Sequence, residues 1–193
     1  MTFGRKEARN TLGAVLMTLA AVSFPAANAQ AGEAEVVQTL TDRMAINDLL
    51  VDYYGQIGTD NHDFSAFFVP EAKLEVNGWL VNGYDEIQAL YDAAAGGAGT
   101  TMGDTTREPP IPRGRFDMMF SNLKITVEGD TAVATMYWYS MAAERLVFPP
   151  AVTEYGRERT QLVKRDGAWR IIDRRVISDG GMPDGQLGRY KPW

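Results

Sequence analysis

Apolar side chains recur mostly three and four residues apart between residues 42 and 58. They are Met44, Ile46, Leu49, Leu50, Tyr53, Tyr54 and Ile57. This spacing places them on one face of an α-helix. Thr41 or Asp42 is the expected N-cap, because a short side-chain oxygen accepts hydrogen bonds from the free N–H groups of a first turn. We therefore predict an amphipathic helix that carries two adjacent tyrosines to the core.

The pattern then changes twice before residue 95. A polar turn and a short helix with three phenylalanines come first, and Pro70 is expected to end that helix because proline has no N–H to donate. The apolar period becomes two in residues 73–81, which predicts a strand. Residues 84–94 return to helical spacing. The next segment, residues 95–114, is rich in Gly, Thr and Pro and is either a lid or a plain surface loop.

The second half of the chain is typical of a sheet. Two hairpins are expected, with strands at residues 116–127, 131–142, 157–165 and 169–177. Their turns contain Glu128-Gly129-Asp130 and Asp166-Gly167. Helices followed by antiparallel hairpins predict an α+β domain, in which a curved, mostly antiparallel sheet wraps around the long N-terminal helix.

Both faces of the strand at residues 131–142 carry large apolar groups. Met136 and Trp138 point one way, whereas Tyr137 and Tyr139 point the other. One face can line the interior, and the other then needs cover. We expect a homo-oligomer for this reason.

The N-terminus has the pattern of a secretory signal peptide. Arg5, Lys6 and Arg9 precede an apolar run at residues 11–26, and Ala27-Asn28-Ala29 matches an A-x-A cleavage site. The rival interpretation is an uncleaved anchor, but the run is short for a span of roughly 20 residues. We predict cleavage after Ala29 and a periplasmic or secreted protein.

The expected organisation is a signal peptide at 1–29, a leader at 30–40, one domain at 41–178 and a C-terminal tail at 179–193. Removing the signal takes away three basic residues and one acidic residue, so the formal charge changes from −6 to −8. An acidic surface argues against nucleic acid as a partner. No later segment is apolar enough to enter a membrane, so we expect no membrane partner after cleavage.

The composition also restricts the chemistry. The chain has no Cys, which excludes thiol catalysis and thiolate metal sites, and its one His, His62, lies in a polar turn. There is no phosphate-binding loop, dinucleotide fingerprint or nucleophile elbow. We expect neither a cofactor nor a metal.

Five segments in order resemble the SnoaL-like branch of the nuclear-transport-factor-2-like superfamily. They are DRMAINDLLVDYYGQI, AFFVPEAKLEVNG, GYDEIQALY, SNLKITVEGDTAVATMYWY and YGRERTQLVKRDGAWRIIDRRV. The resemblance implies a cone-shaped barrel with an apolar pocket under helices, dimers or trimers built across the sheet, and no cofactor. Similar proteins include polyketide cyclases, scytalone dehydratase, ketosteroid isomerase and lyases of lignin-derived diaryl compounds, and other members are not enzymes.

The chain departs from the family pattern at several positions. Met118 and Met119 stand where one or two His are common, Gly58 where Asp is common, and His62 where Trp is usual. Tyr53 matches the helix tyrosine of the family. These departures favour a chemistry other than a His–Asp dyad.

The strand after residue 114 supplies the expected catalytic groups. Its core-facing residues Leu123, Ile125 and Val127 share a parity with Met119, Asp117 and Arg115, so these also point inward unless a bulge intervenes. We predict Asp117 as the base, with Arg115 and Tyr53 as partners for a developing oxyanion or a hydroxyl. The alternative is a structural ion pair of Asp117 and Arg115.

The expected substrate-binding residues surround this strand. They are Tyr54, Met119, Trp138, Tyr139, Ile57 and Phe68. Trp138 and Tyr139 face opposite ways, so only one of them can line the pocket, and parity leaves both open. Glu158 points either inward or into solvent beside Arg157 and Arg159, and solvent is favoured.

Two classes of function remain. The first is a cofactor-independent lyase or dehydratase that uses acid/base chemistry on an aromatic or polycyclic molecule, because aromatic walls suit an aromatic ring. By resemblance, one version is elimination from a lignin-derived diaryl compound or loss of a small fragment such as formaldehyde, and an isomerase or cyclase is another. The second class is a binding module for a small apolar ligand.

Overall fold

The computed structural model describes residues 26–57, 63–98, 106, 108–110, 116–143 and 145–191. The chain divides into two units, residues 1–36 and residues 37–193. The fold below is that of the second unit. Among the described helices, none combines the length and the apolar character that crossing a membrane requires.

The first helix begins earlier than the sequence pattern indicates. α1 spans Ala26–Gln56, so Thr41 and Asp42 lie inside it and the expected N-cap is wrong. The Thr41 hydroxyl donates to the carbonyl of Val37, one turn back. Residues 30–40 are rich in Ala, Glu, Val and Gln with no proline, so nothing in them stops a helix. The expected signal peptide lies mostly outside the described residues and stays a prediction, as does the periplasmic location.

The remaining elements follow in chain order. They are η1 (Phe64–Ala66), β1 (Phe68–Val76), β2 (Trp79–Asn82), α2 (Tyr84–Ala98), β3 (Phe116–Glu128), β4 (Thr131–Ala142), β5 (Ala151–Arg165), β6 (Ala168–Gly180) and η2 (Asp184–Arg189). Pro70 lies within β1 instead of ending a helix. It fits there because the pairing of β1 with β6 is irregular between Phe68 and Lys73, so no ladder N–H is needed at Pro70.

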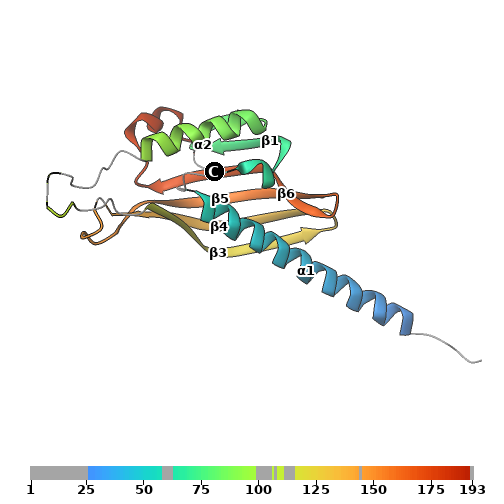
Figure 1. Cartoon of the computed structure of the whole chain (residues 1–193). Helices are drawn as coiled ribbons and strands as arrows, with labels where there is room; N and C mark the ends of the chain where they lie inside the picture. The colour runs from blue at the N-terminus through green and yellow to red at the C-terminus, as the bar shows by residue number, and fades with distance from the viewer. Residues whose placement is uncertain are drawn as a thin grey trace, which may run out of the picture. The chain divides into compact units, whose positions relative to one another are not determined.

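The strands form a six-stranded sheet in the order β2-β1-β6-β5-β4-β3 (Figure 1). All neighbours pair antiparallel except β1 and β6, which are parallel. The two predicted hairpins are β3–β4 and β5–β6. The expected α+β class, with a curved and mostly antiparallel sheet, is confirmed.

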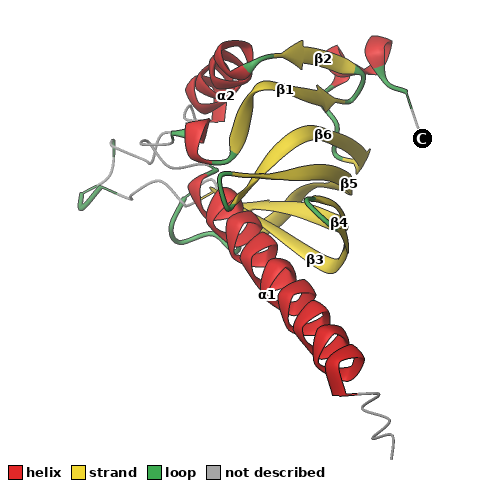
Figure 2. Cartoon of the chain, turned by 90° about the vertical axis from the view of Figure 1, so that its right-hand side faces the viewer, coloured by secondary structure: helices red, strands yellow, loops and turns green. Residues whose placement is uncertain are grey.

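The helices cover one face of the sheet, which we call the inner face. Figure 2 shows the C-terminal part of α1 lying against the sheet and α2 packed beside β1 and β2. From α1, the side chains of Ile46, Leu50, Tyr53 and Tyr54 are buried in the core. The amphipathic pattern therefore identified the core side of this helix, although Met44, which it also placed there, is 67% exposed.

A bulge in β3 reverses the side-chain parity of this strand. The register with β4 shifts between Ser121 and Lys124, and Asn122 has a left-handed φ of 54°. As a result, Ile125 and Met118 both lie on the inner face, although their parities differ.

The bulge overturns the predicted orientation of two candidate residues. Asp117 pairs with Met141, and Met119 pairs with Tyr139, so both lie on the outer face of the sheet. The parity argument that placed the Asp117 carboxylate inside the pocket is wrong. Arg115, its expected partner, lies outside the described residues.

The outer face of β4 and β5 carries exposed aromatic residues. Tyr137 and Tyr155 are each 51% exposed, and Val152 lies near them on β5. A homo-oligomer that covers this face stays a prediction.

Asp42 ties α1 to the β5–β6 hairpin. Its Oδ1 accepts from Lys164 Nζ at 2.7 Å and from Trp169 Nε1 at 2.9 Å, and its Oδ2 accepts from Gln38 Nε2 at 3.1 Å. Burial raises the pKa of this carboxyl, but the bonds from Lys164, Trp169 and Gln38 outweigh burial and lower the pKa below its ordinary value.

Replacing Asp42 by Asn should destabilise the domain by about 1–3 kcal/mol at pH 7, because buried donors lose a charged acceptor. The folded pKa is depressed, so the carboxylate contributes its stability above the unfolded pKa and loses it as the pH falls through the folded pKa. Urea denaturation from pH 7 to pH 3 should show the difference shrinking. Asp52→Asn, an exposed change on the same helix, is the control. A constant difference over this pH range would contradict the role of the charge.

Candidate functional site

A cavity of about 500 Å³ opens between the inner face of the sheet, α2 and η2. Its walls are mainly apolar. The apolar lining comes from Ile57, Phe64, Val76, Trp79, Leu90, Phe116, Met118 and Trp138. Its polar groups gather in two places on the strands, with Gln186 and Arg189 added by η2, and this cavity is therefore the candidate site.

The first polar place is a buried ion pair between neighbouring strands. Arg174 of β6 donates from Nη2 to Glu158 Oε2 of β5 at 2.6 Å, and the two side chains are 3% and 0% exposed. Glu158 also accepts from the Thr160 hydroxyl at 2.5 Å and from the Tyr54 hydroxyl at 2.6 Å. The carboxylate is thus satisfied on both oxygens, as a buried charge requires.

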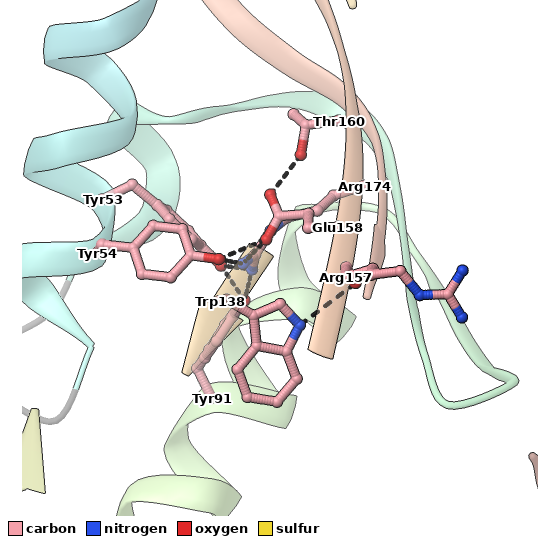
Figure 3. A network of polar contacts seen from close by, with 8 residues as sticks. All are labelled: Tyr53, Tyr54, Tyr91, Trp138, Arg157, Glu158, Thr160 and Arg174. Carbon is pink, nitrogen blue, oxygen red and sulfur yellow. Dashed lines mark hydrogen bonds and ion pairs between the residues drawn. The ribbon is translucent and has the colours of Figure 1, made fainter. Parts of the chain in front are cut away.

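Three tyrosines from the two helices converge on the same guanidinium (Figure 3). Arg174 Nη1 donates to the hydroxyls of Tyr53 and Tyr91, the latter at 2.6 Å, and these two hydroxyls also bond to each other. The guanidinium lies over the ring of Tyr53, 4.3 Å from its centroid. We call Arg174, Glu158, Tyr53, Tyr54 and Tyr91 the Arg174 cluster.

Burial and charge act in opposite directions within this cluster. Burial raises the pKa of Glu158, but Arg174 and the hydrogen bonds from Thr160 and Tyr54 outweigh it, so the pKa lies below its ordinary value. Burial raises the pKa values of Tyr53 and Tyr54 well above 10, although Arg174 lowers them in part. At neutral pH the cluster is therefore one cation, one anion and neutral phenols.

The cluster also reaches the cavity. Tyr91 and Arg174 both line it, and the Tyr91 ring stacks on Phe64 with centroids 4.1 Å apart. Arg174 Nε is buried and has no hydrogen-bond partner among the residues that the structure describes.

The second polar place is formed by Glu154, Ser140, Ser178 and Asn77, which all line the cavity. The Ser178 hydroxyl donates to Glu154 Oε1. Burial raises the pKa of Glu154 above its ordinary value, and the bond from Ser178 only partly offsets this. Within the described part of the chain, no group of three His, Cys, Asp or Glu side chains converges as a metal site would require.

The structure separates the predicted pocket residues into three groups. Ile57 and Trp138 line the cavity, and Trp138, not Tyr139, is the inward-facing one of that pair. Tyr53, Tyr54 and Phe68 are buried in the core, where the two tyrosines contact Arg174.

Met119 and Tyr139 lie on the outer face, so their assignment to the pocket is wrong. The bulge at Asn122 explains why the predicted orientation of Met119 is wrong, because it exchanges Met118 and Met119 between the two faces.

The most polar residues of the site were missed or misplaced by the sequence pattern. Glu158 is buried on the inner face and does not point into solvent. Arg174 is two positions from the apolar Val176 on β6 and so shares its face of the strand, and this shared parity was the available signal for an inward arginine. The signal is weak because the β5–β6 register shifts between Gln161 and Leu162.

Comparison with known proteins supports the fold. The SnoaL-like domain model matches residues 38–175. A nuclear-transport-factor-2-like protein with a cystatin-like fold from Novosphingobium aromaticivorans is 19% identical with a TM-score of 0.60, over 82% of this chain and 95% of that one. A protein of unknown function from Mycobacterium tuberculosis is 21% identical with a TM-score of 0.59, over 80% and 89%.

A third solved structure carries a provisional enzyme name. It is a protein from Novosphingobium aromaticivorans provisionally described as a scytalone dehydratase, 19% identical with a TM-score of 0.54, over 73% of this chain and 86% of that one. Identities this low establish a common fold and leave the reaction open. No curated protein matches the chain.

Removing one member of the buried ion pair leaves the other charge unpaired, so the effects of the two single changes should not add. Arg174→Met or Glu158→Leu alone should cost about 3–5 kcal/mol, because each leaves an unpaired buried charge, whereas the double variant should lose less than the sum. Urea denaturation of the four proteins measures this coupling.

Arg157 provides the control for this cycle, because its bond to Asp179 lies at the surface. Arg157→Met should cost under about 1 kcal/mol. If the single changes at Arg174 and Glu158 lower the free energy of unfolding as little as this control does, the ion pair does not carry the cost of a buried charge and the prediction is wrong.

Proposed function

Because the chain belongs to the SnoaL-like family of the nuclear-transport-factor-2-like superfamily, we propose that it is a cofactor-independent lyase or dehydratase for an aromatic or polycyclic small molecule. The observation that carries the proposal is the carboxyl of Glu154. It faces an apolar cavity, and its pKa is raised by burial. A carboxyl with these properties is suited to take up and return a proton during a reaction.

Glu154 replaces Asp117 as the proposed base. In a dehydration, its carboxylate takes a proton from a substrate carbon, and the C–H electron pair becomes the new double bond. The hydroxyl on the adjacent carbon leaves and receives that proton to form water. In the fragment-loss version, Glu154 takes the proton of a terminal hydroxymethyl group. The breaking C–C bond then supplies the double bond as a hydroxyl leaves the neighbouring carbon. That hydroxyl takes the proton from Glu154, so formaldehyde and water are released.

The Arg174 cluster is the proposed partner for a substrate oxygen. Arg174 and Tyr91 both line the cavity, and the guanidinium and the phenol hydroxyl are hydrogen-bond donors. Such donors stabilise negative charge on a phenolate or a developing oxyanion, and they do so more strongly in a site with little water.

The spacing of the two polar places indicates the length of the substrate. Glu154 and Glu158, the partner of Arg174, are four positions apart on β5, about 13 Å at about 3.3 Å per residue. Aromatic and aliphatic side chains line the wall between them. An elongated molecule with polar atoms toward both ends fits this arrangement, and a lignin-derived diaryl compound is one such molecule.

A non-catalytic binding module is the second candidate. It is favoured by one observation, namely that the Arg174 cluster satisfies most of its polar atoms internally. A preformed cluster of this kind holds a ligand without requiring any proton transfer.

Glu154→Gln should lower turnover of an accepted substrate by about 10²–10⁴-fold while leaving ligand binding nearly intact, because glutamine keeps the shape but cannot take up a proton. Purified protein would be screened by ultraviolet absorbance and mass spectrometry against aromatic alcohols, diaryl propanes and polycyclic ketones with chelator present. For the native protein, kcat/KM should fall as the pH drops through the raised pKa of Glu154.

Two further variants make the result specific. Glu128→Gln changes an exposed glutamate at the β3–β4 turn and should leave turnover unchanged. Asp117→Asn tests the outer-face residue directly. Loss of turnover in Asp117→Asn, but not in Glu154→Gln, would overturn our assignment of the base. Binding without turnover by the native protein across the panel would favour the binding module.

A further inference from the structure

The C-terminal segment forms part of the cavity wall. η2 follows β6 and supplies Gly185, Gln186 and Arg189 to the lining. The segment packs on the β1–β2 turn (Figure 2). Its arginine, Arg189, lies over the Trp79 ring, 4.9 Å from the centroid.

Glycine at the β1–β2 turn permits this close packing. Gly78 has a φ of 86°, and a Cβ at this position would lie 1.9 Å from the carbonyl oxygen of Arg189. No side chain fits in that space, so the turn and η2 are in direct backbone contact. The position of η2 over the cavity is therefore built into the packing of the domain.

A chain of hydrogen bonds leads from η2 to the proposed base. Asn77 Nδ2 donates to Gln186 Oε1 at 2.6 Å and to the Ser178 hydroxyl at 2.9 Å. The Ser178 hydroxyl in turn donates to Glu154 Oε1. The backbone N–H of Ser178 donates to Asn77 Oδ1 at 2.8 Å.

The direction of this chain follows from one backbone donor. The N–H of Ser178 can only face an oxygen, so the atom of Asn77 beside it is Oδ1 and the other atom is the NH₂ group. Because that group donates to the Ser178 hydroxyl, the single hydroxyl hydrogen is left for Glu154. Gln186 accepts the other hydrogen of the Asn77 amide, which holds the amide in this orientation.

We propose that Gln186 is a positioning residue that acts through Asn77 and Ser178 to aim a hydrogen bond at Glu154. This inference rests on the proposed function, in which Glu154 moves the proton. One oxygen of Glu154 is held by Ser178, and the other is left to exchange a proton with a substrate. η2 therefore contributes to the proton chemistry as well as to the shape of the cavity.

The surroundings of Glu154 make its pKa a sensitive readout of this chain. Burial raises the pKa, and the bond from Ser178 is the group that lowers it. The charged residues that line the same cavity are Arg174 on β6 and Arg189 on η2. The other described elements of the lining contribute uncharged side chains there, such as Ser140 on β4 and Asn77 at the β1–β2 turn.

The test is a titration of the Glu154 carboxyl by carbon NMR in full-length protein with labelled glutamate, with Glu154→Gln used to assign the signal. Ser178→Ala removes the donor and should raise the pKa of Glu154 by about one pH unit. Gln186→Met keeps the size of the side chain but not the acceptor, and it should raise the pKa by about half a pH unit. Leu187→Ser, an exposed change in η2, should leave the pKa where it is.

The outcomes separate this inference from the proposed function. If Ser178→Ala shifts the pKa and Gln186→Met does not, Gln186 has no positioning role and the inference is wrong. A lack of shift in both variants also overturns it. The titration needs no substrate, so it tests the role of Gln186 independently of turnover. If Glu154→Gln leaves turnover unchanged, that result rejects only the proposed function. With a substrate in hand, the acid limb of kcat/KM should move upward in Gln186→Met by the same half unit.

Discussion

The buried ion pair of Arg174 and Glu158 is the constraint on which the inner part of this domain depends. Moving two charges out of water is costly, and their attraction compensates only when the geometry is good and the remaining polar atoms are bonded. Here the partners come from both helices and from two strands. Tyr53 and Tyr54 belong to α1, Tyr91 to α2, and the charges to β5 and β6. The polar interior therefore requires all of these elements to be in place together.

Two glutamates of the same strand show how position alone changes the chemistry of a side chain. Glu158 is the more deeply buried, yet its pKa is lowered because Arg174 lies 2.6 Å away. Glu154 is only partly buried, but burial raises its pKa, and the hydrogen bond from the neutral hydroxyl of Ser178 offsets this only in part. Carboxyl groups with pKa values pushed in opposite directions are typical of sites in which one group stabilises charge and another moves protons.

Local irregularities of the backbone decide which residues reach the cavity. The bulge at Asn122 places Met118 inside and Asp117 outside, and the left-handed turn of Asn77 and Gly78 lets η2 approach the mouth of the cavity. Asn77 has a second role, because its side chain connects η2 to Ser178. Asn77 therefore shapes both the β1–β2 turn and the hydrogen bonds of the site.

The sequence by itself determined the class of fold, the core face of α1, the hairpins and the inward pair of adjacent tyrosines, because these follow from apolar periodicity and turn residues close together in the chain. It could not place Asp117, since one extra residue in a strand reverses parity and leaves no clear mark in the apolar pattern. It also missed the pairing of Arg174 with Glu158 and the chain from Gln186 to Glu154. Those partners are 16 and 32 positions apart, and only the pairing of β5 with β6 and the return of the C-terminal segment bring them together. Short-range patterning determined the elements, whereas the charges and hydrogen bonds of the site depended on long-range contacts that only the tertiary structure supplies.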